Sequence, residues 1–217
     1  MHTLIISGGT IDTDFALDLL RKEKFDHIIG VDGALKFCKE QNIVPTRIVG
    51  DFDTLEPEIL TWYQTHTQIE IRQFNPVKDA TDTQIAIELA MELGSHQITL
   101  IGGTGTRLDH MLGNIQTLYL PFTKGIDCRI VDVHNRIRLV SGELHLKMAE
   151  QWGKYVSLIP FTTDVEGVDL IGFKYPLEKS HFSVLGSGSL GVSNEITEED
   201  AIIRIEKGIM ILVESKD

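Results

Sequence analysis

Hydrophobic and polar positions follow two different patterns along the chain, and the change falls near residue 133. Before it, short apolar runs end at glycine or aspartate, and segments with helical spacing of their apolar positions lie between them. The strongest helix is expected over Thr83–Leu93, because one stripe along it is apolar and Gly94 ends it. That stripe consists of Ile85, Ala86, Leu89, Ala90 and Leu93.

Strand and helix alternate through this first part. Strands are expected over Thr3–Ser7, His27–Val31, Arg47–Val49, Ile69–Phe74, Gln97–Ile101 and Arg129–Val133. Helices are expected over Phe15–Lys24, Ala34–Gln41, Glu56–Thr65, Thr83–Leu93 and about Asp109–Tyr119, the last with Met111, Leu112, Ile115 and Leu118 facing inward. The alternation predicts an α/β domain over residues 1–133, with a mostly parallel sheet and flanking helices.

The second part, residues 134–217, contains short β-rich runs separated by turn residues. These runs are Arg136–Val140, Leu144–Met148, Tyr155–Ile159, Val165–Leu170, His181–Leu185, Ala201–Ile205 and Ile209–Val213. They predict an all-β, sandwich-like domain. The glycine- and serine-rich segment 186–195 is expected to be a flexible hairpin loop, or a small-residue surface that lets a flat ligand approach the backbone.

Ligands of parallel sheets bind outside the carboxyl ends of the strands. In this chain those ends carry glycine and aspartate: Gly8-Gly9, Asp32-Gly33, residues 50–53, residues 78–82 and residues 103–107. Because all of these segments meet at one edge of the predicted sheet, the sequence predicts a binding site there.

Two carboxylates stand two positions apart in Gly50-Asp51-Phe52-Asp53. In extended or turning backbone such residues can point to the same side, where they repel unless a cation lies between them. Oxygen ligands of this kind suit Mg²⁺, which is usually held by one or two carboxylates and substrate phosphates. The alternative is that both aspartates cap the helix that begins near Glu56-Pro57.

The segment 78–82 places a cation, a hydroxyl and two carboxylates within five positions. Asp82 is a candidate metal ligand, and Lys78 and Thr81 are candidate phosphate partners. In the alternative interpretation Thr81 is the N-cap of the next helix and Asp82 a favourable charge in its first turn; both interpretations can hold at once.

A glycine-rich turn, Gly102-Gly103-Thr104-Gly105, precedes the helix that begins near Asp109. It lacks the third glycine of a dinucleotide fingerprint, and the chain has no Walker A sequence. Such a turn can still present N–H groups to phosphate, and Arg107 can add a bidentate contact or form a surface ion pair. His110 is either a base or a structural residue.

Composition narrows the class of protein. The chain has 217 residues, 42% of them hydrophobic and 24% charged, as in an ordinary globular protein. A net charge of -12 without a basic cluster argues against nucleic acid as a partner, and it implies that a polyphosphate substrate arrives with a metal ion. Cys38 and Cys128 lack metal-ligand spacing and are expected to be reduced thiols in a cytoplasmic protein. No signal peptide is expected, and no apolar run approaches the ~18 residues of a membrane span.

Four motifs in order resemble the thiamine pyrophosphokinase (thiamine diphosphokinase) family. They are Gly50-Asp51-Phe52-Asp53-Thr54, Lys78-Asp79-Ala80-Thr81-Asp82, Gly103-Thr104-Gly105-Thr106-Arg107-Leu108-Asp109-His110 and Leu190-Gly191-Val192-Ser193-Asn194. The resemblance covers essentially the whole chain. Thr54 stands where the family usually has serine, and Asp32-Gly33-Ala34 lacks a second glycine that the family often carries.

This resemblance implies transfer of a pyrophosphoryl group from ATP to the hydroxyl of thiamine, which gives thiamine diphosphate and AMP. It also implies Mg²⁺, an ATP-binding first domain, and a second domain for thiamine binding and dimerisation, with thiamine near the interface of a homodimer. The implied roles are metal binding by Asp51, Asp53 and Asp82, ATP binding by Lys78, Thr81, Gly103, Gly105, Arg107 and Asp109, and thiamine binding by Ser193, Asn194 and Asp109. Asp79 and Asp32 are both candidates for a general base.

Two other functions stay open on the sequence. One is a Mg²⁺-dependent transferase that acts on another small heterocyclic alcohol. The other is a non-catalytic module that binds thiamine or a nucleotide. The presence of Asp51, Asp53 and Asp82 together argues against the second, because a binding module needs no complete set of carboxylates.

Overall fold

The computed structural model describes residues 1–53, 55–74, 80–186 and 189–217. The chain divides into two compact units, Met1–Val133 and His134–Asp217. Among the described residues, no helix combines the length and the apolar character needed to cross a membrane.

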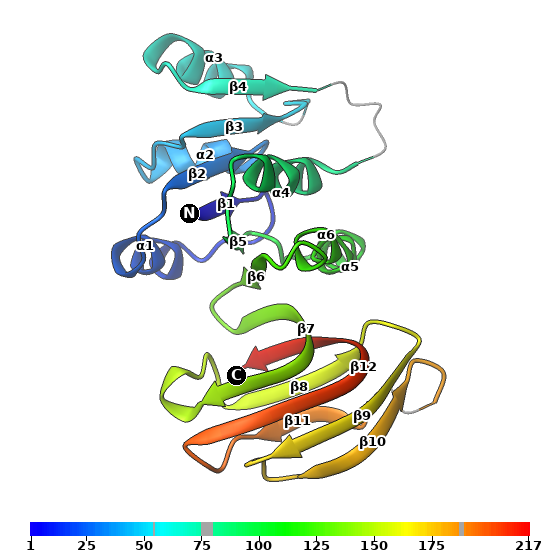
Figure 1. Cartoon of the computed structure of the whole chain (residues 1–217). Helices are drawn as coiled ribbons and strands as arrows, with labels where there is room; N and C mark the ends of the chain where they lie inside the picture. The colour runs from blue at the N-terminus through cyan, green and yellow to red at the C-terminus, as the bar shows by residue number, and fades with distance from the viewer. Residues whose placement is uncertain (54, 75–79, 187–188) are drawn as a thin grey trace. The chain divides into compact units, whose positions relative to one another are not determined.

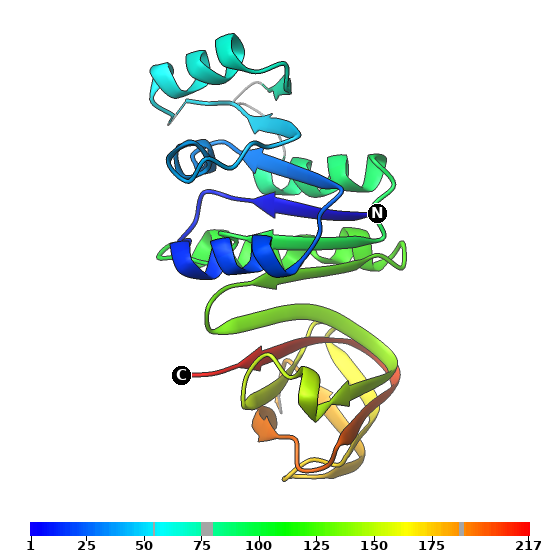
Figure 2. The same ribbon diagram turned by 90° about the vertical axis from the view of Figure 1, so that its left-hand side faces the viewer.

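The first unit is a parallel sheet with helices on both faces, as the sequence predicts (Figure 1). Its strands are β1 (His2–Ile6), β2 (His27–Val31), β3 (Arg47–Gly50), β4 (Glu70–Gln73), β5 (Gln97–Ile101) and β6 (Asp127–Val131). Its helices are α1 (Thr13–Lys22), α2 (Ala34–Glu40), α3 (Pro57–His66), α4 (Asp82–Glu92), α5 (Leu108–Thr117) and α6 (Tyr119–Phe122). Helices α1 and α2 lie on one face of the sheet and α4 and α5 on the other, as Figures 1 and 2 show together.

The order of the strands fixes where a ligand can enter. The sheet runs β4-β3-β2-β1-β5-β6, and every neighbouring pair is parallel. The chain therefore moves outward from β1 to β4 and then returns to the other side of β1 to form β5. The crevice at such a reversal, outside the carboxyl ends of β1 and β5, is the general ligand site of open α/β sheets.

Helix α5 differs from its sequence prediction in which side chains it buries. Leu112 is exposed instead of facing inward, whereas Asn114 is 8% exposed and Leu118 is buried. The helix ends at Thr117 and the short α6 follows. The apolar spacing misses this arrangement because the buried position at Asn114 is held by a polar contact rather than by apolar packing.

The second unit is strand-rich, as predicted. It contains β7 (Asn135–Lys147), the 3-10 turn η1 (Met148–Glu150), β8 (Tyr155–Pro160), β9 (Asp164–Ile171), β10 (Leu177–Ser183), β11 (Gly191–Glu195) and β12 (Asp200–Ser215). The long strand β12 pairs along its length with β7, and it also pairs with β9 through its first half and with β8 through its second half. Its inward residues join a single apolar core with Phe182, Leu158 and Val168.

Two sequence expectations for this unit are wrong. β7 and β12 are each one long strand, not two short ones, because Gly142 and Gly208 adopt positive φ angles within a register shift instead of making turns. In addition, Gly191–Glu195 is a strand paired with β8, not a loop. A Cβ on Gly191 would lie 2.8 Å from the carbonyl oxygen of Leu158, so this glycine marks close backbone approach rather than flexibility.

Candidate functional site

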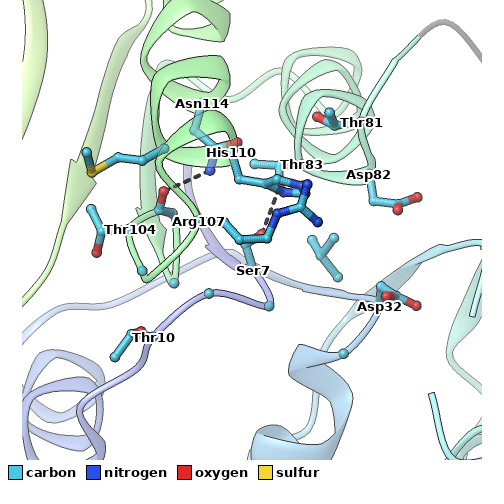
Figure 3. A pocket seen from close by; sticks show the side chains of 18 of the residues that line it. Ser7, Thr10, Asp32, Thr81, Asp82, Thr83, Thr104, Arg107, His110 and Asn114 are labelled. Atoms are coloured by element: carbon cyan, nitrogen blue, oxygen red, sulfur yellow. Dashed lines mark hydrogen bonds between the residues drawn. The ribbon is translucent and has the colours of Figure 1, made fainter. Parts of the chain in front are cut away.

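A cavity of about 650 Å³ lies at the predicted edge of the parallel sheet. It is lined by segments that follow β1, β2, β3 and β5 and by the first turns of α4 and α5 (Figure 3). The lining residues are Ser7–Thr10, Val31–Gly33, Asp51, Ala80–Thr83, Gly102–Arg107, His110, Met111 and Asn114. Sequence-distant segments therefore meet in one place, as the positions of the strand ends predict.

The loops after β1 and β5 are joined to each other by backbone hydrogen bonds. Gly9 N–H donates to Gly102 O at 2.9 Å, and Thr10 N–H donates to Thr104 O at 2.8 Å. Glycine is required at both contacts, since a Cβ on Gly9 would lie 2.2 Å from Thr104 O and one on Gly102 would lie 2.1 Å from Ser7 O. The floor of the cavity is thus made of closely packed backbone.

The loop Gly102–Arg107 offers N–H groups to a ligand. Within the described part of the chain, the N–H groups of Gly103, Thr104, Gly105 and Thr106 donate to no protein acceptor. Helix α5 begins directly after this loop, at Leu108, and its N-terminus carries partial positive charge. Together these groups form a site suited to phosphate oxygens.

Arg107, the N-cap residue of α5, forms an ion pair with Asp109 in the first turn of that helix. Its Nη2 lies 2.7 Å from Asp109 Oδ2, and this hydrogen bond lowers the pKa of Asp109 to about 2. Both side chains are exposed, and Arg107 lines the cavity. The expected surface ion pair is therefore present, while the assignment of both residues to substrate stays a prediction.

Three carboxylates gather where Asp32 and Asp51 line the cavity. Asp32, Asp51 and Asp53 each offer an oxygen, and these oxygens lie within 4.8 Å of one another. The crowding raises the pKa of Asp53, first through its hydrogen bond with Asp51 and repulsion from it, and then through the charges of Asp32 and Asp82. Asp82 is outside this close group, although it lines the same cavity (Figure 3).

A buried aromatic residue positions this cluster. Phe52 has a φ of 63° and belongs to a buried apolar cluster with Leu35, Ile59 and Tyr63. Gly50 makes room for it, because a Cβ there would lie 2.9 Å from the ring of Phe52. With Phe52 turned into the core, the carboxylates on either side of it remain at the surface.

The capping interpretation of Asp51 and Asp53 is wrong. Helix α3 begins at Pro57 with Glu56 as its N-cap, and the Glu56 side chain makes no capping hydrogen bond. Asp51 instead accepts a hydrogen bond from the N–H of Asp53 at 3.2 Å.

The N-terminus of α4 brings hydroxyl groups and Asp82 to the cavity. Thr81 is the N-cap and accepts from Gln84 N–H at 3.2 Å, so its expected capping role is confirmed. The hydroxyls of Ser7 and Thr83 lie 2.7 Å apart and are buried, which fastens the helix to the end of β1. Lys78, Asp79 and Thr54 lie outside the described residues.

In the second unit, the resemblance points to Ser193 and Asn194. Ser193 is exposed and has a φ of 60°, whereas Asn194 is 5% exposed. The Asn194 amide binds the backbone of Tyr175: its Oδ1 accepts from Tyr175 N–H at 3.0 Å, and its Nδ2 donates to Tyr175 O at 2.8 Å. The Tyr175 side chain is exposed.

Sequence reasoning missed Ser7, Thr83 and Asn114 at the cavity and Tyr175 in the second unit. The signal for Asn114 was its polar side chain on an otherwise apolar stretch of helix. The others carried no local signal, because the contacts that position them join segments far apart in the chain.

Comparison with known proteins finds matches for both units of the chain. The family model described as thiamin pyrophosphokinase, catalytic domain, matches residues 17–130, and the model of the vitamin B1 binding domain matches residues 142–210. The chain is 35% identical to thiamine pyrophosphokinase of Bacillus subtilis over 195 residues, which cover 87% of each protein.

Solved structures give the same result. The crystal structure of thiamine pyrophosphokinase from Bacillus subtilis matches with a TM-score of 0.86 at 30% identity, with all of both chains covered. That from Geobacillus thermodenitrificans matches with a TM-score of 0.85 at 31% identity and covers all of this chain and 98% of the other. The yeast thiamin pyrophosphokinase, at 16% identity and a TM-score of 0.81, shares the fold; the alignment covers 99% of this chain and 86% of the yeast chain.

Proposed function

Because the chain belongs to the thiamine pyrophosphokinase family, we propose that its cavity is the place where ATP and Mg²⁺ meet thiamine. The protein is an ATP-dependent pyrophosphotransferase, a thiamine diphosphokinase. The observation that carries the site assignment is that two features meet at one cavity: a carboxylate cluster and a loop of available N–H groups.

The reaction joins the hydroxyl oxygen of thiamine to the β-phosphorus of ATP. The bond between that phosphorus and the oxygen bridging to the α-phosphate breaks, AMP leaves with the bond's electron pair, and the hydroxyl proton passes to a base. Catalysis of this kind is mostly positioning and stabilisation of charge. We assign the loop 102–107 and Arg107 to the phosphate oxygens, with Lys78 as a further cation.

The carboxylates fit Mg²⁺. Asp51 and Asp53 offer oxygen ligands close to each other, and the raised pKa of Asp53 reflects negative charge that a cation would neutralise. When bound, Mg²⁺ neutralises charge on the phosphates. We propose Asp51 and Asp53 as its holders, with Asp82 as the third ligand and Asp32 beside them. The base is proposed to be a carboxylate at this edge, Asp32 or Asp79.

Nucleotide analysis after incubation with ATP, Mg²⁺ and thiamine tests the reaction. We expect AMP and thiamine diphosphate in equal amounts, and no AMP without thiamine. Thiamine-dependent ADP would instead indicate single phosphoryl transfer. AMP formation with another heterocyclic alcohol but not with thiamine would assign a different acceptor.

On the thiamine side, we propose that Asn194 acts by holding Tyr175. Replacing Asn194 by alanine removes the contacts that fix both backbone groups of Tyr175. We expect the KM for thiamine to rise about tenfold, a cost of roughly 1–2 kcal/mol, with the KM for ATP unchanged. Steady-state kinetics with each substrate varied in turn checks this, and an effect confined to ATP would contradict the placement.

We also propose that the protein is a homodimer. Helix α5 exposes Leu108 and Leu112 next to the residues that line the cavity, and the second unit exposes Val184, Leu185 and Leu190 before β11. Exposed apolar side chains on each unit are typical of protein interfaces. Light scattering should give twice the mass of the chain.

We further propose that the protein is located in the cytoplasm. Cys38 and Cys128 are free and buried, which supports this location.

A further inference from the structure

One buried polar side chain contacts the loop Gly102–Arg107 from helix α5, which follows it. Asn114 lies in the middle of α5, two turns from the N-terminus of that helix, and is 8% exposed. Its Nδ2 donates to Gly103 O at 2.8 Å, a bond drawn in Figure 3. A buried amide at a helix position where apolar packing is the norm needs such a partner, since an unsatisfied polar group there is costly.

Among the carbonyl groups of Gly102, Gly103 and Thr104, that of Gly103 is the one that accepts no hydrogen bond from the loop after β1. Asn114 donates to it instead. Gly102 O and Thr104 O accept from Gly9 and Thr10, whereas Gly103 O, between them, accepts from Asn114. On its other side Gly103 lies close to the sheet, since a Cβ there would be 3.0 Å from side-chain atoms of Ile130 and Leu100. Asn114 therefore fixes the middle peptide of the loop from the helix side.

We propose that Asn114 is a positioning residue for nucleotide phosphates: it sets the peptide of Gly103 so that the N–H groups of the loop meet the phosphate oxygens of ATP. The inference rests on the proposed ATP site. Thr104 supports the same loop from the opposite flank, because its hydroxyl donates to Asp132 Oδ2 at 2.8 Å. The N–H groups from Gly103 to Thr106 are then held in place before the substrate arrives, and such preorganisation lowers the cost of binding.

The test is the Asn114→Asp variant, which keeps the shape of the side chain and replaces the donor with an acceptor that repels Gly103 O. We expect the KM for ATP to rise about 10- to 100-fold, as expected for one lost buried hydrogen bond and a displaced loop, with the KM for thiamine within about twofold of wild type. Asn114→Ala, which removes the donor without repulsion, should show the same change to a smaller extent and serves if the first variant does not fold.

Thr117→Val is the matched control, because the Thr117 hydroxyl donates within α5, to Gly113 O at 2.9 Å, and Thr117 is not among the described residues that line the cavity. We expect it to keep both KM values. Asn114 would be merely structural if its variants kept the wild-type KM for ATP, or if both KM values rose equally.

Calorimetric titration with ATP and Mg²⁺ separates this inference from the reaction itself. If wild type bound ATP but made no AMP, the proposed reaction would fail, and weaker ATP binding by Asn114→Ala would still support the positioning role. If wild type and variant bound ATP equally, the positioning role would be overturned whatever the product.

Discussion

Replacing Asp53 by asparagine is expected to lower turnover at least about 100-fold while making the metal-free protein more stable at neutral pH. Loss of an outer-shell partner alone typically costs a metal site 10- to 100-fold, so loss of a proposed ligand should cost more. The gain in stability comes from removing one charge from a cluster in which Asp51, Asp32 and Asp82 already raise the pKa of Asp53.

The sign of the pH dependence follows from that raised pKa. Ionising Asp53 costs more in the folded protein than in the unfolded chain, where its pKa is near the ordinary 3.8. Wild type therefore loses stability relative to Asp53→Asn as the pH rises from about 3.8 through the raised pKa. Below about pH 3.8 Asp53 is protonated in both states, and this pH-dependent difference in stability disappears.

Thermal unfolding with and without Mg²⁺ checks both the expected gain in stability of the metal-free variant and the role of Asp53 as a ligand. Mg²⁺ should raise the melting temperature of wild type and have little effect on Asp53→Asn, because a cation stabilises only the state that binds it. Asp18→Asn is the matched control, since Asp18 pairs with Lys22 on the exposed surface of α1 at 2.6 Å. Equal Mg²⁺ shifts in wild type and Asp53→Asn, or unchanged turnover, would show that Asp53 is not a ligand.

Sequence reasoning predicted a cavity at this edge because a parallel sheet brings its strand ends together whatever the loops contain. The alternation Asp51-Phe52-Asp53 also indicates which side chains point inward: the aromatic ring is buried and the two carboxylates are not. Spacing could not show which third carboxylate completes the close group. Asp32 lies there because it adopts a φ of 41° after β2, a backbone conformation with no clear signature in its neighbours.

The second unit shows a different limit. Glycine within an apolar run is as typical of a bulge as of a turn. Because of Gly142 and Gly208, the sequence therefore predicted two short strands in place of β7 and two in place of β12. Long-range pairing decides between the two. In the structure the two strands pair on both sides of the register shift, and this pairing holds each glycine inside a continuous strand.

The same pairing creates a buried ion pair. Arg136 on β7 lies directly opposite Glu214 on β12. Two guanidinium nitrogens of Arg136 donate to the two carboxylate oxygens, Nε to Oε2 at 2.7 Å and Nη2 to Oε1 at 2.6 Å. The Glu214 side chain is 1% exposed and that of Arg136 16%, and the guanidinium lies 5.6 Å from the centre of the Trp152 ring.

Replacing Arg136 by methionine is expected to lower the free energy of unfolding by about 3–5 kcal/mol, because it leaves the carboxylate of Glu214 buried without its cation. The double variant Arg136→Met, Glu214→Leu should recover most of that loss, since a buried ion pair is often no more stabilising than apolar residues of similar volume. Urea unfolding of wild type, the single variants and the double variant gives the coupling energy directly.

The exposed pair Arg204–Glu143 is a control, and Arg204 also lies 3.7 Å from the buried carboxylate of Asp169. The pair joins the same two strands, its residues are also directly opposite, and its Nη2–Oε2 distance is 2.7 Å, but the side chains are 42% and 47% exposed. Glu143→Gln, which leaves Arg204 beside Asp169, should therefore cost less than about 1 kcal/mol. A similar cost for both pairs would show that register alone sets their energy, whereas the expected difference would show that a charge buried between β7 and β8 makes the second unit depend on Arg136.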